Sequence, residues 1–351
     1  MPEEISKEKI DRLINEYFSS SGSWLKMSEA NPGIFNNIKD FLVGGGKRLR
    51  PLIFRLSYNG YADEPLEDIY KVELALEFLH SFVVIHDDII DRSEFRRKTP
   101  SLHARFGKYL KNAASPGARI KGEDLAIVAG DIIYALAINI FQSVSAAAKI
   151  KEKAMSILTE TAFTTGYGEM LEMLEAGIPL EDSSTESIYK IYDLKTAHYT
   201  FCCPLILGAV FAGNADDETE KLNEAGLALG RSYQIMDDIH ELLDCNDISE
   251  IPVDLTDKTH TLLLLRAFET GSQKERGCIS SFLRSRENTP DELMEILAIT
   301  RKQDVIQYGI AQIDQLKQSA WKSFENLKMK EPYKSRLIEF INGLISIKTD
   351  R

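Results

Sequence analysis

The sequence predicts an all-α protein, and three observations support that prediction. Apolar residues recur at helical spacing through most of the chain, no segment alternates in the manner of a half-buried strand, and the interruptions are short. No long Gly/Ser-rich or Pro-rich linker separates two halves. We therefore predict a single domain over residues 1–351, with about ten or more helices around a central cavity. Its motif-bearing core spans about residues 40–270, and residues 271–351 form further helices without assigned chemistry.

The clearest helical stripe lies in residues 69–91, where the apolar residues step by three or four positions, at Val72, Leu76, Leu79 and Val83. Comparable stripes run through residues 124–144, 188–213, 224–243 and 260–270. Glycine, proline and asparagine mark the expected breaks, at Asn31–Gly33, Gly44–Gly46, Thr99–Pro100, Ser115–Gly117, Gly177–Pro179 and Glu250–Pro252. We expect Lys108–Glu123 to be a mobile or partner-facing loop.

Composition is typical of a soluble globular protein and narrows the range of partners. The chain is 44% hydrophobic and 27% charged, with a net charge of −12, which argues against binding to nucleic acid. The N-terminal segment is acidic and no apolar run reaches the length of a membrane span. We therefore expect a cytoplasmic protein without stable membrane insertion. The cysteines show no metal-type pairing and are expected to be buried, reduced thiols, at Cys202, Cys203, Cys245 and Cys278.

The strongest chemical signal is HDDIIDRSEFRRKTP, residues 86–100. On a helix, Asp87 and Asp91 project from one face, one turn apart, with His80 and Val84 upstream on the same stripe. Two such carboxylates repel unless a cation lies between them, and oxygen ligands suit Mg²⁺. We expect this helix to end near the Thr-Pro break. The alternative is a solvated acidic helix end followed by a basic loop, but the preceding apolar run FVVIH argues against it.

A second acidic cluster strengthens the metal interpretation. In SYQIMDDIHELL, one stripe of an apolar helix carries Gln234, Asp237, Asp238 and Glu241. Carboxylates on two buried-looking helices suggest groups that face each other across a cavity, and they do not stay ionised there without cations. A divalent metal that bridges them to a polyanionic ligand resolves this conflict.

Basic residues that suit such a ligand also occur. GGGKRLRP, residues 44–51, places Lys47, Arg48 and Arg50 between flexible glycines and a proline suited to the first turn of a helix. The segment is not a P-loop, because that motif requires a different spacing and a Ser or Thr. Lys195 and Thr196 lie in IYDLKTAHY. A lysine in that context is also compatible with a surface residue whose stem covers apolar neighbours.

These motifs, taken together and in this order, resemble the trans-prenyltransferases, the polyprenyl diphosphate synthase family. GGKRLRP, HDDIID with its following Arg pair, LKTA and YQIMDD span Gly44 to Leu265. The resemblance implies the isoprenoid synthase fold, a homodimer and dependence on Mg²⁺, with about three ions. It also implies head-to-tail condensation of isopentenyl diphosphate with allylic diphosphates. In that chemistry metal ions and basic groups stabilise the departing diphosphate, and a dry apolar cavity protects the carbocation.

The resemblance also implies roles for individual residues. By the family pattern the metal ligands are Asp87, Asp91, Asp237 and Glu241, with Asp88 and Asp238 beside them in the catalytic set. Isopentenyl diphosphate is held by Lys47, Arg50, His80 and Arg97. Arg96 and Lys195 hold the allylic diphosphate. Thr196 and Gln234 complete the catalytic set as polar groups near the developing cation.

The departures from the family pattern lie mostly in the second half. Glu241 replaces the third aspartate of the second motif, and Ser249 replaces an expected lysine. A further lysine, Lys258, comes one place early, so that Thr259 stands at the expected position. Lys98 stands where glycine is common, and Glu169 and Glu172 replace a more usual Gln and Asp. These changes keep two other functions open. One is a terpene cyclase-like enzyme, and the other is a non-catalytic or regulatory subunit of a heteromer.

Product length is the remaining expectation. In this family, bulky residues four or five places before the first motif aspartate form a floor beneath the growing chain, and Val83 and Phe82 occupy those places here. The pattern resembles short-chain synthases that make C20 geranylgeranyl or C15 farnesyl diphosphate, with C20 favoured. A role for Phe82 in core packing is equally compatible with its position at the edge of the stripe.

Overall fold

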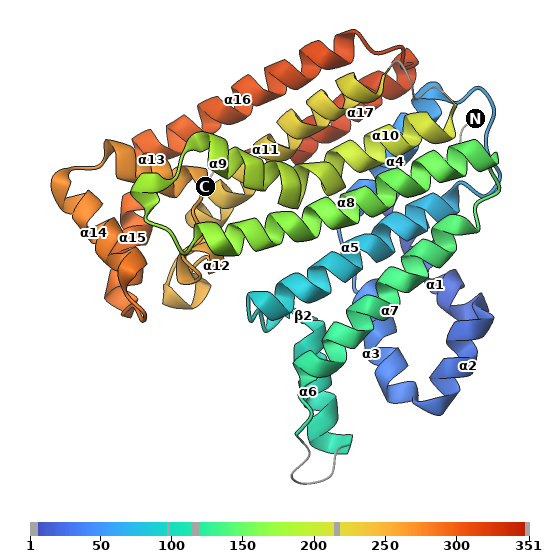
Figure 1. The fold of residues 1–351 in the computed structure, drawn as a ribbon, viewed down its shortest axis with the longest axis horizontal. Helices are drawn as coiled ribbons and strands as arrows, with labels where there is room; N and C mark the ends of the chain where they lie inside the picture. Colours follow the sequence, from blue (N-terminus) through green and yellow to red (C-terminus); the bar gives the residue numbers. More distant parts are fainter. Residues whose placement is uncertain (1–5, 97–98, 114–118, 214–217, 348–351) are drawn as a thin grey trace. The chain divides into compact units, whose positions relative to one another are not determined.

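The structure is a computed structural model that describes residues 6–96, 99–113, 119–213 and 218–347. Its residues group into two compact units. Unit 1 comprises Met1–Arg55 and Ala62–Met155, and unit 2 comprises Leu56–Tyr61 and Ser156–Arg351. Helices dominate both units, which confirms the all-α prediction (Figure 1).

Unit 1 is built from helices α1 to α7 and one short hairpin. The helices are α1 (Lys7–Ser20), α2 (Gly22–Ala30), α3 (Pro32–Val43), α5 (Tyr70–Ile90), α6 (Leu102–Ala113) and α7 (Gly122–Gln142), together with the first part of α4 (Leu49–Tyr61). The hairpin pairs β1 (Phe95–Arg96) with β2 (Thr99–Pro100) in antiparallel register. No strand was predicted here, and two residues per strand are too few to show an alternating pattern.

The core of unit 1 forms where α5 lies along α7 (Figure 1). The close approach depends on Gly130 in α7, since a Cβ there would lie 2.2 Å from the His86 ring. On the other side of α5, Phe78 stacks on Phe18 of α1 with ring centroids 5.7 Å apart. Helix α5 is therefore buried along most of its length, as its apolar stripe predicts.

Unit 2 contains the remaining helices. They are α8 (Ala148–Glu175) from Ser156 onward, α9 (Thr185–Tyr192), the π-helix η2 (Asp193–Cys202), α10 (Cys203–Phe211), α11 (Thr219–Asp244), α12 (Val253–Thr256), α13 (Leu262–Thr270), α14 (Gln273–Arg284), α15 (Pro290–Thr300), α16 (Gln303–Glu325) and α17 (Glu331–Leu344). Short 3₁₀ turns occur at η1 (Leu180–Asp182) and η3 (Ile248–Glu250). Helix α11 is central, because it packs against both α16 and η2 (Figure 1).

Two details correct the sequence-based expectations. Lys108–Ala113 belong to α6 and Gly122 begins α7, so the expected loop at Lys108–Glu123 is wrong at both ends, and residues 114–118 lie outside the described part. Cys202, Cys203 and Cys245 are buried free thiols as predicted, whereas Cys278 is half-buried.

Two helical stretches have the length and apolar composition of a membrane span, contrary to the expectation that none would. They are Gly122–Gln142, whose most apolar window is 39% buried, and Thr185–Phe211, whose window is 78% buried. Core helices of soluble proteins meet the same criterion, so these two stretches are weak indications of a membrane.

Candidate active site

The first acidic motif lies at the C-terminal end of α5. The helix ends at Ile90 with Asp91 as its cap, which is earlier than the predicted end at the Thr-Pro break. Arg92 adopts a left-handed conformation with φ 54°, and the Ser93 amide donates to the Asp88 carbonyl at 2.9 Å. This is a Schellman-type termination with arginine where glycine is usual. This helix end was not predicted, because glycine is the residue that usually indicates such a termination.

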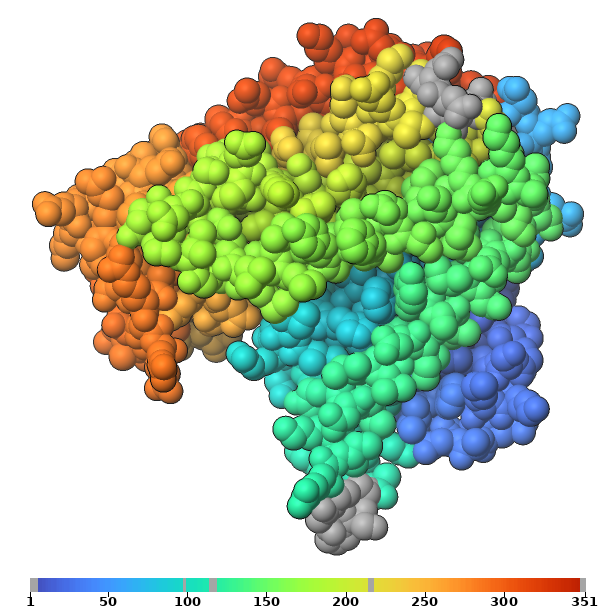
Figure 2. Space-filling view, in the orientation of Figure 1, coloured from blue at the N-terminus to red at the C-terminus, as the bar shows by residue number. Residues whose placement is uncertain are grey.

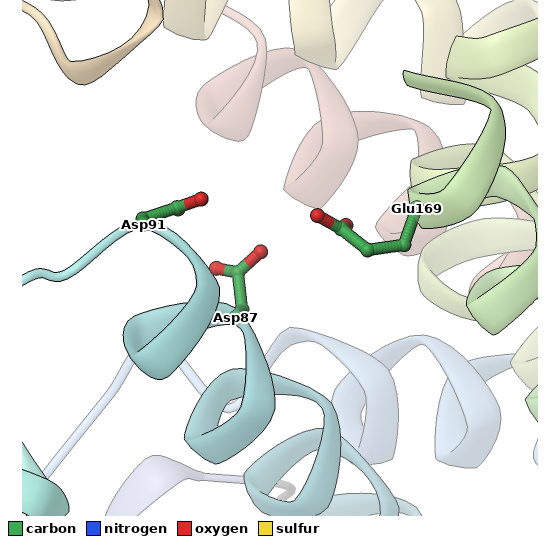
Figure 3. Close-up of side chains that lie close together, drawn as sticks. All are labelled: Asp87, Asp91 and Glu169. Carbon is green, nitrogen blue, oxygen red and sulfur yellow. The ribbon is translucent and has the colours of Figure 1, made fainter. Parts of the chain in front are cut away.

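The helix end places the motif's carboxylates together. Figure 3 shows Asp87 and Asp91 projecting from the same side of α5, and oxygens of the two side chains lie within 4.8 Å of each other. The C-terminal end of a helix carries partial negative charge, so it disfavours carboxylates unless positive charge is supplied. Hard oxygen donors in this setting fit Mg²⁺.

Arg96 supplies part of the positive charge. The β1–β2 hairpin brings its guanidinium back to the motif, where Nε donates to Asp88 at 2.7 Å and an Nη donates to Asp87 at 2.9 Å. Asp88 is only 1% exposed, and burial raises its pKa although Arg96 acts in the opposite direction. Asp88 is therefore buried and holds the Arg96 guanidinium in place, whereas Asp87 and Asp91 are half-buried.

A small pocket adjoins this cluster. Its walls come from the end of α3, the glycine run, the middle of α5 and the hairpin, with Gly44, Gly45, Arg48, His80, Val84 and Arg96 among the lining residues. The pocket thus brings together His80 and Val84, from the stripe upstream of Asp87, with Arg96, which follows the first acidic motif in the sequence. Arg50 is buried and Lys47 is exposed in the same segment, and Arg97 lies outside the described residues.

Arg48 differs from its basic neighbours. It is 5% exposed and lies at φ 50°, and its guanidinium donates to Asp11 at 2.8 Å and to Glu77 at 2.7 Å. A third hydrogen bond reaches the Leu42 carbonyl at 3.1 Å. The positive charge of Arg48 is therefore engaged in holding α1, α3 and α5 together, and the expectation that it completes an anion site is not supported.

In unit 2, a π-helix carries Lys195 and Thr196. Such i→i+5 turns are uncommon and occur frequently at functional sites. Small residues on the neighbouring helices let them approach this segment closely. A Cβ at Gly230 of α11 would lie 2.2 Å from the Cβ of Ala197, and one at Gly168 of α8 would lie 2.6 Å from the backbone nitrogen of Lys195. The π-helix was not predicted, since its residues follow the same apolar stripe as the helices around it.

Lys195 is embedded among carboxylates. Its ammonium lies 3.0 Å from Glu169 and also pairs with Glu172, both on α8, and its side chain is 25% exposed. Lys195 is therefore an ion-paired, half-buried residue and not a lone lysine on the surface. In the sequence the two glutamates are departures from the family pattern without an assigned role, and in this structure both pair with Lys195.

The second acidic motif is organised by hydrogen bonds. Thr196 donates to Gln234 at 2.7 Å, and Gln234 donates in turn to Asp238 at 2.9 Å. Asp238 also accepts a hydrogen bond of 2.6 Å from Tyr192, which the sequence analysis did not select. Burial raises the pKa of Asp238 well above its usual value, and the negative charge of Asp254 acts in the same direction. Asp237 and Glu241, on the same helix, are half-buried and exposed.

The departure at the end of the motif region has a structural explanation. Lys258 adopts φ 61°, and its ammonium donates to the Ser285 carbonyl and lies 5.6 Å from the centre of the Phe282 ring. Burial lowers the pKa of Lys258. The Lys258 ammonium therefore binds a carbonyl at the C-terminal end of α14, so the lysine that comes one place early does not take the role of the expected one.

A family model for polyprenyl synthetase matches residues 32–300. The chain belongs to the polyprenyl synthetase family. The chain is 30% identical over 294 residues to the geranylgeranyl diphosphate synthase of Saccharolobus solfataricus, a match that covers 82% of this chain and 80% of that one. It is 27% identical over 275 residues to the octaprenyl diphosphate synthase of Escherichia coli, with 76% and 77% covered. The resemblance found in the motifs is thereby confirmed.

Solved structures with high structural similarity establish the fold of the chain. The geranylgeranyl pyrophosphate synthase of Corynebacterium glutamicum, solved with isoprenyl diphosphate and magnesium, matches with a TM-score of 0.84 at 20% identity. The match covers 98% of this chain and all (100%) of that one. A polyprenyl synthase of Caulobacter crescentus, solved with calcium and isoprenyl diphosphate, matches with a TM-score of 0.77 at 22% identity. This match covers 97% of this chain and 94% of that one. The predicted isoprenoid synthase fold is therefore correct.

Proposed function

We propose that the protein is a Mg²⁺-dependent prenyltransferase that condenses isopentenyl diphosphate head to tail with allylic diphosphates. Its product is a short trans-prenyl diphosphate of C15–C20, with C20 favoured. The observation that carries the proposal is the end of α5, where Asp87 and Asp91 adjoin Arg96 and a pocket lined by His80 and the glycine run. Membership of the polyprenyl synthetase family supports the same activity.

Each group of residues has a proposed task. Metal would be held by Asp87, Asp91, Asp237 and Glu241, and would supply the positive charge that stabilises the departing diphosphate. The isopentenyl substrate would be held by Lys47, Arg50, His80 and Arg97. Arg96 and Lys195 would bind the allylic diphosphate, which requires each to exchange a carboxylate partner for a phosphate oxygen. Thr196 and Gln234, already hydrogen-bonded to each other, would lie near the developing cation.

The direct test is incubation of the purified protein with Mg²⁺, isopentenyl diphosphate and, separately, dimethylallyl, geranyl and farnesyl diphosphates. We expect linear products that stop at C15 or C20 in mass spectra, and no products when EDTA is present. Folded protein that elongates none of the primers would contradict the proposal. Cyclic hydrocarbons made from a primer alone would indicate a cyclase instead.

Phe82 is predicted to limit chain length. Its ring packs 4.9 Å from Tyr134 on α7 and 4.9 Å from His86 on α5, measured between ring centroids, and its side chain is half-buried. Phe82→Ala would open space beside α5, and we expect products at least one five-carbon unit longer. Product lengths by mass spectrometry check this.

The control is Phe78→Leu in the same helix. The Phe78 ring packs on Tyr17 and Phe18, so this substitution should lower the melting temperature without changing the product. Unchanged products from Phe82→Ala would assign Phe82 to core packing.

We also propose a homodimer, located in the cytoplasm. Helix α8 lies at the surface in Figure 2. Its unit 2 portion exposes one apolar face, at Phe163 (67%), Tyr167 (44%), Met170 (56%) and Leu174 (67%). Residues at this spacing share one side of a helix, and an exposed stripe of this kind is typical of an interface.

Phe163→Asp is expected to weaken the dimer by about 30-fold or more in Kd, because a charge buried in an apolar interface costs about 2 kcal/mol or more. Sedimentation velocity over a concentration series measures the change. Gln315→Asp on α16, an exposed position in another helix of unit 2, is the matched control and should dimerise as the wild type does. Identical dissociation constants for the two variants would move the interface away from α8.

A further inference from the structure

Tyr192 occupies a position that the proposed chemistry does not yet use. It is the last residue of α9, directly before the π-helix, and its side chain is 4% exposed. Its hydroxyl donates to Asp238 at 2.6 Å and accepts the Leu262 amide at 3.1 Å. One buried oxygen atom therefore joins α9 to the second acidic motif on α11 and to the first residue of α13.

Both partners of this hydroxyl need it. Asp238 is 5% exposed, and a buried carboxylate without hydrogen-bond donors is strongly destabilised. Its two oxygens accept from the neutral side chains of Tyr192 and Gln234. Leu262 is the first residue of α13, so its amide has no acceptor within its own helix. The Tyr192 hydroxyl is the acceptor that the structure provides.

This arrangement fixes one turn of α11. Asp238 follows Asp237 directly and lies one turn before Glu241. The position of the Asp238 carboxylate therefore sets the orientation of the turn that carries the Asp237 and Glu241 side chains. A phenylalanine at position 192 would fill nearly the same volume but would leave Asp238 and the Leu262 amide each without this partner. The tyrosine hydroxyl, rather than the ring, is therefore the informative group.

We propose that Tyr192 is a positioning residue for the second acidic motif: it holds Asp238 in place and ties that turn of α11 to the start of α13. The inference rests on the proposed function, in which Asp237 and Glu241 of the same turn bind Mg²⁺. Tyr192 itself touches neither metal nor substrate in this scheme. Groups that orient metal ligands typically contribute about 10–100-fold to metal affinity or activity.

The test compares Tyr192→Phe with Tyr189→Phe. Tyr189 lies on the same helix, and its hydroxyl donates at 3.0 Å to Gln312 of α16, away from the acidic motif. The readout is the melting temperature during a Mg²⁺ titration in the presence of inorganic diphosphate. We expect Tyr192→Phe to need about 10–100-fold more Mg²⁺ for half-maximal stabilisation, and Tyr189→Phe to keep the wild-type requirement.

Amide hydrogen exchange gives a second readout without metal. Exchange at Leu262 should be faster in Tyr192→Phe than in the wild type, and unchanged in Tyr189→Phe, because only the first substitution removes the acceptor of that amide. A lower melting temperature for Tyr192→Phe with an unchanged Mg²⁺ requirement would reduce Tyr192 to a structural role and overturn the inference. A wild-type protein that Mg²⁺ and diphosphate do not stabilise would instead overturn the proposed function.

A double variant shows whether Tyr192 acts through Asp238. In the Asp238→Asn background, adding Tyr192→Phe should raise the Mg²⁺ requirement no further, because the group that Tyr192 positions is already altered. Additive effects would mean that Tyr192 acts elsewhere and would contradict the proposal. In the double variant no buried carboxylate lacks its donor and only the Leu262 amide loses its partner, so this comparison stays available if Tyr192→Phe alone is unstable.

Discussion

Asp87→Asn is expected to lower kcat by about 10³-fold or more at saturating substrate. A catalytic metal ion contributes several kcal/mol of charge stabilisation in the transition state, and each 1.36 kcal/mol corresponds to about tenfold in rate. The asparagine keeps the shape of the side chain, and Arg96 keeps its hydrogen bond to Asp88. We therefore expect the fold to persist while metal binding fails.

Steady-state kinetics with varied Mg²⁺ measure this effect, with circular dichroism as the check on folding. The matched control is Asp40→Asn, an exposed aspartate on α3 in the same unit, which should retain wild-type kcat and Mg²⁺ dependence. A kcat of Asp87→Asn within about tenfold of the wild type would contradict the role of Asp87 as a metal ligand, since so small a loss corresponds to about 1.4 kcal/mol or less.

Arg48→Met is expected to lower the free energy of unfolding by about 3–5 kcal/mol, the largest effect on stability among these variants. The substitution leaves Glu77, whose side chain is 2% exposed, buried beside α5 without its positive partner. It also removes the ion pair with Asp11 and the hydrogen bond to the Leu42 carbonyl. Unit 1 should therefore unfold at a clearly lower urea concentration.

Urea unfolding monitored by tryptophan fluorescence isolates this effect. The chain has two tryptophans, and in a Trp321→Phe background the remaining Trp24, which is 5% exposed in α2, reports on unit 1. The double variant Arg48→Met/Glu77→Met should recover most of the loss, because apolar residues often replace a buried ion pair without net cost. A midpoint for Arg48→Met equal to that of the wild type would show that the ion pairs contribute little.

The sequence was informative where one helix carries the whole signal. The stripe in residues 69–91 became α5, buried along its apolar face, and the four-residue spacing of Asp87 and Asp91 put both carboxylates on one side of its end. Helical periodicity is a local property, so position along the chain specifies which face a side chain occupies. The ends of α2 and α3 at Asn31 and Gly44 followed from the same local rules.

The details of the site required the tertiary structure. The sequence grouped Lys47, Arg48 and Arg50 as similar cations, but only contacts from α1 and α5 show that Arg48 is engaged by Asp11 and Glu77. Lys195 likewise acquires its two carboxylates from α8, a separate helix. The charge that a side chain has available depends on its neighbours in space, and these come from distant parts of the sequence.

By itself, the sequence determined the all-helical fold, the two acidic motifs and the family, because each depends on residue types at fixed spacing along one helix or in one order along the chain. Only the tertiary structure decided the early end of α5, the π-helix and the junction at Tyr192. The end of α5 places an arginine at a left-handed position, and the π-helix lies against glycines of α8 and α11. Tyr192 gains its role from hydrogen bonds to residues 46 and 70 positions away. The π-helix and the junction at Tyr192 depend on packing between elements, which residue spacing within one element does not encode. The end of α5 depends on a backbone conformation that an arginine does not indicate in the sequence.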